Sequence, residues 1–240
     1  MLVEVCANSL ESALNAQNAG ADRIELCLEL GLGGITPSFG LLKLIKEKIT
    51  IPVHVLIRPR SGDFTYDDLE FETMLHDIQL CVELGFEGIV SGALHADLKL
   101  DIERTTKLSL ASKDLNFTFH RAFDWVKDPF LVLNQLEKIG VDYILTSGQQ
   151  LKAIDGLELL TQLHQKAKTC TIMPGSGINA DNARLFKEKG FKVIHLSGTT
   201  FYPKNANLSR LPMSTLSFFQ EDKKIISDIK ILKDVVNRVK

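Results

Sequence analysis

The chain has 240 residues, of which 45% are hydrophobic and 24% are charged, and its formal net charge is −2. These values are ordinary for a globular protein and exclude a strongly basic surface, so no nucleic-acid partner is expected. No apolar run is long enough for a membrane helix, and the first residues lack the basic start of a signal peptide. We therefore expect a cytoplasmic protein without a membrane partner.

One pattern recurs along the chain: a helical stretch ends at a glycine, and a short apolar strand follows at once. Glycine is favoured after a helix because it adopts positive φ at no steric cost, and the four glycines in question are Gly20, Gly85, Gly140 and Gly190. Good helix-starting residues stand at Ser9, Asp128 and Asn179. With the remaining apolar runs, this rhythm predicts eight strands, at residues 2–6, 22–27, 53–58, 88–91, 117–121, 142–147, 170–174 and 192–197.

Strands that alternate with helices imply parallel βαβ units, and eight of them favour a closed (β/α)8 TIM barrel over a doubly wound open sheet. The turn after the first strand, CANSLES, lacks the GxGxxG motif, which excludes a dinucleotide-binding doubly wound sheet. We expect a single domain over residues 1–240. It contains a long loop over 198–227 and a C-terminal helix over 228–239. The loop has a function, forms an oligomer contact, or is a surface loop exposed to solvent.

Several predicted strands carry polar residues on one of their two faces. Parallel strands are covered on both sides and are usually apolar throughout, so these polar faces are unusual. Because successive side chains alternate between faces and the apolar face must pack on helices, we expect the polar face to point into the barrel. The residues concerned are Glu4, Cys6, Arg23, Glu25, Cys27, His54, Arg58, Thr118, His120, His195 and Ser197.

The position of each polar residue along its strand separates two interpretations. Glu4 and Arg23 lie early in their strands, where a structural salt bridge is one explanation. Glu25 and His120 lie near the C-terminal ends, where the active sites of barrel enzymes form. If the protein is an enzyme, Glu25, His120 and Glu4 are the candidate proton donors and acceptors.

The loops that follow the strands suggest an anionic ligand. Guanidinium groups match carboxylate and phosphate, and turns after the seventh and eighth strands of barrels often hold phosphate. Structural arginines and plain tight turns are the alternatives. The candidate anion-binding residues are Arg58, Arg60, Arg121, Asp124, Gly175, Ser176, Gly177, Ser197 and Gly198.

Eight phrases spread over residues 1 to about 200 resemble the copper homeostasis protein CutC family. They are EVCANS, GADRIELC, GGITPS, IRPRSGDFTY, TFHRAFD, LTSG, GSGI and HLSG. The resemblance implies a cytosolic (β/α)8 barrel, often oligomeric, and a role in copper tolerance. It also implies that Cu(I), when bound, is held by the cysteines of EVC and ELC, here Cys6 and Cys27.

Two functions follow as hypotheses. In the first, Cys6 and Cys27 end neighbouring strands on the inward face and bind Cu(I), a soft ion that suits thiolates; a pair of inert buried cysteines is the alternative. In the second, the barrel is an isomerase or lyase acting on a small anionic or phosphorylated metabolite. No lysine ends a strand on the inward face, and HxH and HExxH are absent, so Schiff-base and familiar zinc-hydrolase patterns are missing. A homo-oligomer, dimer or tetramer, is expected in either case.

Overall fold

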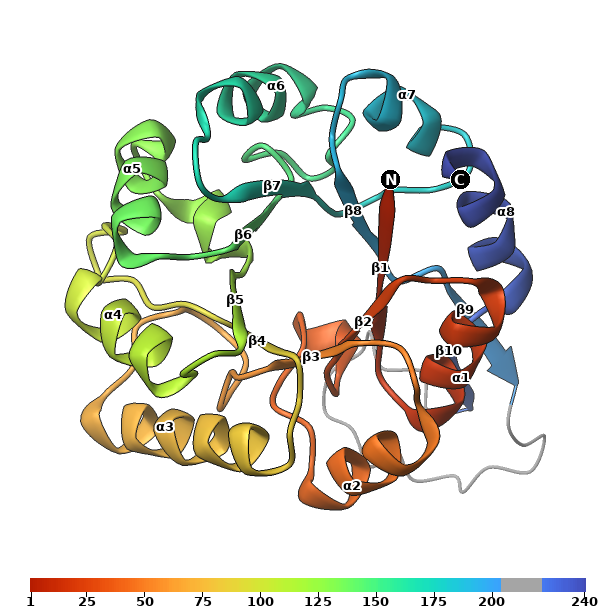
Figure 1. Cartoon of the computed structure of the whole chain (residues 1–240), viewed down its shortest axis with the longest axis horizontal. Helices are drawn as coiled ribbons and strands as arrows, with labels where there is room; N and C mark the ends of the chain where they lie inside the picture. The colour runs from red at the N-terminus through yellow and green to blue at the C-terminus, as the bar shows by residue number, and fades with distance from the viewer. Residues whose placement is uncertain (204–221) are drawn as a thin grey trace.

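Eight parallel strands form a nearly closed barrel surrounded by helices in the computed structural model, which describes residues 1–203 and 222–240 (Figure 1). The strand order is β7-β6-β5-β4-β3-β2-β1-β8, and Figure 1 shows β8 beside β7 where the ring closes. The predicted TIM barrel is confirmed. Its strands are β1 Leu2–Ala7, β2 Arg23–Leu26, β3 Val53–Leu56, β4 Gly88–Ser91, β5 Asn116–Phe119, β6 Tyr143–Thr146, β7 Thr171–Pro174 and β8 Val193–Leu196.

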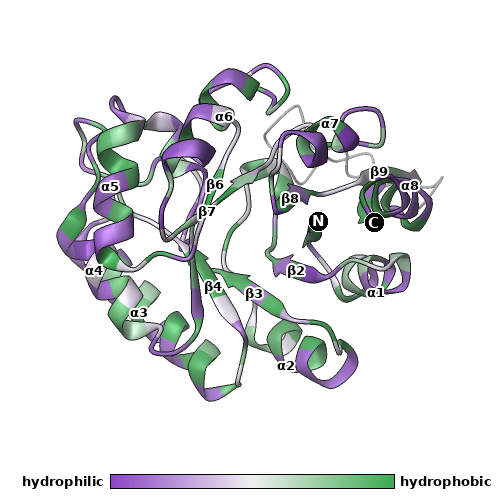
Figure 2. Ribbon diagram, turned by 45° about the horizontal axis from the view of Figure 1, so that its top comes forward, coloured by the Kyte–Doolittle hydropathy of each residue, from purple (hydrophilic) through white to green (hydrophobic). Residues whose placement is uncertain are grey.

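Helices follow the strands and cover the outside of the barrel (Figure 1). Figure 2 shows hydrophobic and hydrophilic residues alternating along α3, α5 and α8, as expected for helices with one face on the sheet and one in water. The elements are α1 Leu10–Ala19, η1 Leu30–Leu32, α2 Phe39–Lys48, α3 Asp68–Glu83, α4 Ile102–Ala111, η2 Arg121–Trp125, α5 Pro129–Ile139, α6 Leu157–Lys166, α7 Ala183–Glu188 and α8 Ile229–Val239. Within the described residues, no helix is long and apolar enough to span a membrane.

The predicted helix ends are confirmed with one exception. Ser9 and Asp128 accept hydrogen bonds from backbone N–H groups in the first turns of α1 and α5, and the four predicted glycines all have φ between 70° and 90°. The exception is Asn179. Its side-chain oxygen accepts the N–H groups of Asp181 and Asn182, closing a separate turn, so α7 begins only at Ala183.

The segment predicted as one long loop, 198–227, contains secondary structure at both of its ends. Strands β9 Thr199–Pro203 and β10 Lys223–Ser227 pair in antiparallel fashion, and the part between them, 204–221, lies outside the described residues. Polar side chains of α1 and the preceding turn hold β10 in place, because Asn8 and Asn15 donate to backbone carbonyls of that strand. The C-terminal helix follows as predicted.

The two faces of the barrel strands differ as the alternation predicted. Outward residues such as Val3, Val5, Ile24 and Leu26 are fully buried in the main hydrophobic core between strands and helices. The inward residues form two small apolar clusters instead, one of which contains Cys6, Cys27, Leu56 and Val90. The rest of the interior is filled by buried polar and charged side chains, so the barrel axis is where the site must be sought.

Candidate functional site

A cavity of about 410 Å³ opens at the C-terminal end of the barrel. Its wall is made partly of apolar residues that include Leu30, Leu56, Phe64 and Leu145. Most of the residues predicted for the site face it as well. These are Cys6, Glu25, Arg58, His120, Arg121, Ser176, Gly177, Ser197 and Gly198.

The two predicted metal ligands lie side by side. Cys6 is near the end of β1 and Cys27 follows β2, and their Sγ atoms are 3.4 Å apart. Cys27 is fully buried behind Cys6, which lines the cavity. The hydrogen bond with Cys27, burial and the charge of Glu25 hold the pKa of the Cys6 thiol well above its usual value, so this thiol is protonated at neutral pH.

Glu25 stands beside the cysteines because it is the register partner of Cys6 across β1 and β2. The Cys6 thiol donates a hydrogen bond to Oε1 of Glu25 at 3.5 Å, while Oε2 is buried and accepts no hydrogen bond from the described residues. Burial and the nearby Glu4 charge raise the pKa of Glu25, against the opposing effect of His195. A buried carboxylate with a free oxygen can accept a proton or a cation.

Glu4 occupies the layer below and connects three strands. It is the register partner of Arg23 on one side and of His195 on the other. Its Oε2 lies 2.5 Å from Nε of Arg23, and its Oε1 lies 2.8 Å from Nδ1 of His195. Arg23 also stacks on the Tyr143 ring, at 4.2 Å from its centroid. The salt-bridge interpretation of Glu4 and Arg23 therefore matches their contacts.

Charge pairing outweighs burial in this lower layer. Burial alone would raise the pKa of Glu4, but Arg23 and His195 lower it to about 2. Burial would likewise lower the pKa of His195, whereas Glu25, Cys6 and Glu4 raise it well above the usual value. Glu4 is fully buried and does not line the cavity, so it can act on a ligand only through His195.

His120 faces the same cavity from the end of β5. Its Nδ1 accepts a hydrogen bond from the Ala122 N–H, and its ring lies 4.7 Å from that of Phe64. Nε2 is buried without a partner among the described residues. Burial and the Arg58 charge lower the pKa of His120 to about 3, so the imidazole is neutral at physiological pH.

The arginines predicted to bind an anion differ in how many of their donors already bond to other protein groups. Arg58 donates hydrogen bonds to the carbonyls of Leu32, Gly34 and Gly62 and so holds two loops together. Its Nε is buried and has no hydrogen-bond partner in the described structure. Arg60 binds Glu70, Asp63 and the Thr65 carbonyl. Arg60 is not part of the cavity wall.

Arg121 is the arginine best placed for an anion. It is half-exposed at the cavity, where Nε donates to Asp124 and Nη2 to the Ser147 hydroxyl. Asp124 in turn accepts hydrogen bonds from the Thr146 hydroxyl and from the Ser147 and Gln149 N–H groups. Asp124 thus fixes the loop after β5 to the end of β6 and lies outside the wall of the cavity.

The glycine-containing turns after β7 and β8 both line the cavity, but Gly175 does not. Ser176, Gly177 and Gly198 have positive φ, and their backbone N–H groups donate to no acceptor within residues 1–203 and 222–240. Gly175 packs below them: a Cβ there would lie 2.5 Å from a Leu145 methyl carbon, so its role is close packing. The Ser176 hydroxyl donates to the Leu151 carbonyl, which leaves backbone N–H groups as the donors to a ligand.

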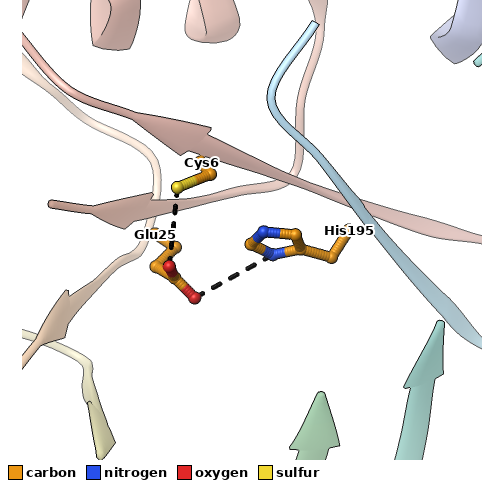
Figure 3. Close-up of side chains that lie close together, drawn as sticks. All are labelled: Cys6, Glu25 and His195. Carbon is orange, nitrogen blue, oxygen red and sulfur yellow. Dashed lines mark hydrogen bonds and ion pairs between the residues drawn. The ribbon is translucent and has the colours of Figure 1, made fainter. Parts of the chain in front are cut away.

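One residue of the site was not among the sequence candidates. His195 lines the cavity, and together with Cys6 and Glu25 it forms a group whose potential ligand atoms all lie within 4.8 Å of one another (Figure 3). The sequence placed His195 on the inward face of its strand, and that was the available signal. Its importance depends on the register of β8 with β1, which no local motif reveals.

Comparisons with known proteins agree with these features. A family model described as the CutC family matches residues 1–200. A relative from Salmonella agona, a family protein named CutC, is 45% identical over 92% of this chain and 89% of its own. The crystal structure of CutC from Streptococcus agalactiae is 34% identical, covers 82% of this chain and 98% of its own, and superposes with a TM-score of 0.78.

A more distant structural match supports the barrel fold and nothing about function. Thiamine phosphate pyrophosphorylase from Pyrococcus furiosus has a TM-score of 0.60 at 16% identity, covering 99% of this chain and 95% of that one. Its barrel architecture is the same, while its sequence carries no functional argument. The matched family model spans the eight barrel strands and the site residues described above, the CutC relative is 45% identical over most of the chain, and the chain belongs to the CutC family.

Proposed function

We propose that this protein binds Cu(I) through Cys6 and Cys27 at the mouth of the barrel. The observation that carries the proposal is the 3.4 Å separation of two inward-facing sulfurs on neighbouring strands. Thiolates are the ligands that Cu(I) prefers, and the Streptococcus agalactiae relative is described as a candidate copper homeostasis protein. A role in copper homeostasis for this chain follows from the pair and from its family.

The donor set fits the ion with one adjustment. Metal–thiolate bonds of about 2.3 Å would set two sulfurs about 4.6 Å apart in a linear arrangement. The observed sulfurs are closer, so binding needs a third donor or a small movement of Cys6. Cys6 has room to move because it faces the cavity, whereas Cys27 is packed behind it.

Competition titration of the reduced protein with a Cu(I)-selective chromophoric chelator tests this proposal. The wild type is expected to bind one Cu(I) per chain, and Cys6→Ser and Cys27→Ser are each expected to lower the affinity by about 100-fold or more, corresponding to about 2.7 kcal/mol. Cys170→Ser is the matched control, since Cys170 is a buried cysteine outside the cavity. Equal affinity in the wild type and the Cys6→Ser, Cys27→Ser double variant would refute the proposal.

A second function is supported by the cavity itself: turnover of a small anionic metabolite. Among the described residues that line the cavity, Arg121 and the N–H groups of Gly177 and Gly198 provide donors, and Glu25 and His120 provide proton carriers. Proton transfer of the isomerase or lyase kind suits such a pair. Copper association and this activity share the region around Cys6 and Glu25, because the Cys6 thiol donates a hydrogen bond to the Glu25 carboxylate.

Thermal shift measurements with inorganic phosphate and with small dicarboxylates test the anion site. The wild type is expected to gain stability with each binding anion, and Arg121→Gln is expected to lose that gain. An equal gain in the wild type and in Arg121→Gln would remove the anion site from the proposal. The homo-oligomer and the cytoplasmic location stay predictions, which size-exclusion chromatography with light scattering and cell fractionation can check.

A further inference from the structure

Glu25 and His195 lie beside Cys6 and are not ligands in the proposed Cu(I) site. Cys6 offers sulfur, Glu25 oxygen and His195 nitrogen, and one potential ligand atom from each lies within 4.8 Å of the other two. All three residues are more than nine-tenths buried. A mixed set of sulfur, oxygen and nitrogen suits a borderline divalent ion such as Zn²⁺ better than it suits Cu(I).

The Glu25 carboxylate is the clearest sign of a missing ligand. Its Oε2 is buried and has no hydrogen-bond partner in the described part of the chain. Figure 3 shows this oxygen turned toward the imidazole of His195, at 3.9 Å from Nδ1. A buried oxygen of this kind costs free energy unless it is satisfied, and a cation held by Glu25 together with the ring nitrogen of His195 that Glu4 does not engage would satisfy it.

The imidazole of His195 is held as metal-binding histidines usually are. Nδ1 is engaged by Oε1 of Glu4 at 2.8 Å, and Glu4 is fixed by Arg23. A histidine ligand commonly donates one ring N–H to a carboxylate and presents the other nitrogen to the ion. In Figure 3 the second ring nitrogen lies on the side of Cys6, and this nitrogen is the one left for an ion.

We propose that Cys6, Glu25 and His195 form a three-ligand site for a borderline divalent cation of the Zn²⁺ class, whose fourth coordination position faces the cavity. Three protein ligands with one open position are the arrangement of catalytic rather than structural zinc. The open position points to the space lined by His120 and Arg121, so a small anion or a water molecule would occupy it. The ligands come from β1, β2 and β8, which explains why no local zinc motif occurs in the sequence.

This site shares Cys6 with the Cu(I) pair but excludes Cys27, and that difference makes the two proposals separable. Zn²⁺ affinity is measured by competition with a chromophoric chelator. Co²⁺ serves as a spectroscopic probe, because a Co²⁺–thiolate bond gives a sulfur-to-metal charge-transfer band. The variants are Glu25→Gln, His195→Asn, Cys6→Ser, Cys27→Ser and the control Cys170→Ser. The change His195→Asn keeps an amide N–H near Glu4 and removes the second ring nitrogen, the one proposed to bind the ion.

Glu25→Gln and His195→Asn are each expected to weaken Zn²⁺ binding by about 100-fold or more, and Cys6→Ser is expected to abolish the Co²⁺ charge-transfer band. Cys27→Ser and Cys170→Ser are expected to keep Zn²⁺ affinity within about fivefold of the wild type. Circular dichroism of each variant checks folding. Cu(I) affinity is measured in parallel, and it is expected to fall in Cys27→Ser alone among the Glu25, His195 and Cys27 variants.

Three results would overturn the proposal. The first is a Co²⁺ spectrum of the wild type without a charge-transfer band, which needs no variant to interpret. The second is unchanged Zn²⁺ affinity in both Glu25→Gln and His195→Asn. The third is a loss of Zn²⁺ binding in Cys27→Ser as large as that in Glu25→Gln, which would mean that the cysteine pair is the only metal site.

Discussion

The lower layer of the barrel interior, around Glu4 and Arg23, and the upper layer, around Glu25 and His120, contain similar side chains with different roles. In the lower layer, Arg23 and Glu4 are buried together, and Arg23 also contacts Tyr143 and Met173. In the upper layer, polar atoms of Glu25 and His120 are just as buried and have no partner among the described residues. Charge that is fully paired stabilises the fold, whereas polar groups left open toward a cavity are available to a ligand.

Removing the arginine of the lower layer should have the largest effect on stability. Arg23→Met leaves Glu4 as a buried charge with only His195 for a partner, and such a loss typically costs about 3–5 kcal/mol. Urea denaturation at pH 7 measures the free energy of unfolding. The double variant Arg23→Met, Glu4→Gln should recover part of the loss, because it removes the unpaired charge. A loss below about 1 kcal/mol in the single variant would show that the pair is not structural.

Acid should destabilise the protein through the upper layer. The folded pKa of His120 is lowered to about 3 from 6.5, so below pH 6.5 the unfolded chain takes up a proton that the folded protein refuses. Stability therefore falls as the pH falls through the window from 6.5 toward 3. At about 1.4 kcal/mol per pH unit, the loss from this residue is about 2–3 kcal/mol by pH 4.5.

His120→Asn isolates this contribution, because Asn removes the titrating ring and keeps an oxygen that can accept the Ala122 N–H. Urea denaturation at a series of pH values between 4.5 and 7 should show a shallower dependence in this variant than in the wild type. His76→Asn is the control, since His76 is an exposed histidine on α3, and it should leave the slope unchanged. An identical slope in His120→Asn and the wild type would contradict the burial of a neutral imidazole.

The smallest stability effect is expected for an arginine of the upper layer. Arg121 is half-exposed and pairs with Asp124, which keeps its hydrogen bonds from Thr146, Ser147 and Gln149 when the arginine is lost. Arg121→Gln should therefore lower the free energy of unfolding by no more than about 1 kcal/mol. Denaturation alongside Arg23→Met gives the comparison directly, and equal losses in the two variants would erase the distinction between the layers.

The recurring order of helix, glycine and strand was enough to predict the barrel, and the alternation of residues along each strand was enough to predict its inward face. Glu25 and His120 point inward because of their place in the period of two, and the four helix-ending glycines follow from their position before strands. The register between distant strands was not predictable in this way. It places His195 next to Glu4 across 191 residues of sequence, and no local pattern encodes that contact.

Side-chain partners were also beyond the reach of the sequence. Arg58, Arg60 and Arg121 follow their strands in similar fashion, yet Arg60 points away from the cavity to Glu70 and Asp63. Arg58 is occupied by backbone carbonyls, which depend on the path of the loop around Gly34 and Gly62. The strands β9 and β10 were missed because their pairing joins segments on either side of a long connection.

X-ray absorption spectroscopy of the reduced wild-type protein loaded with one equivalent of Cu(I) counts the sulfur atoms bound to the ion. It thereby tests whether the upper layer of the barrel is a ligand site built around Cys6 and Cys27. The expected spectrum has two sulfur ligands, with or without one lighter donor from the cavity. A spectrum with one sulfur or none, in protein whose four cysteines are reduced, would contradict it.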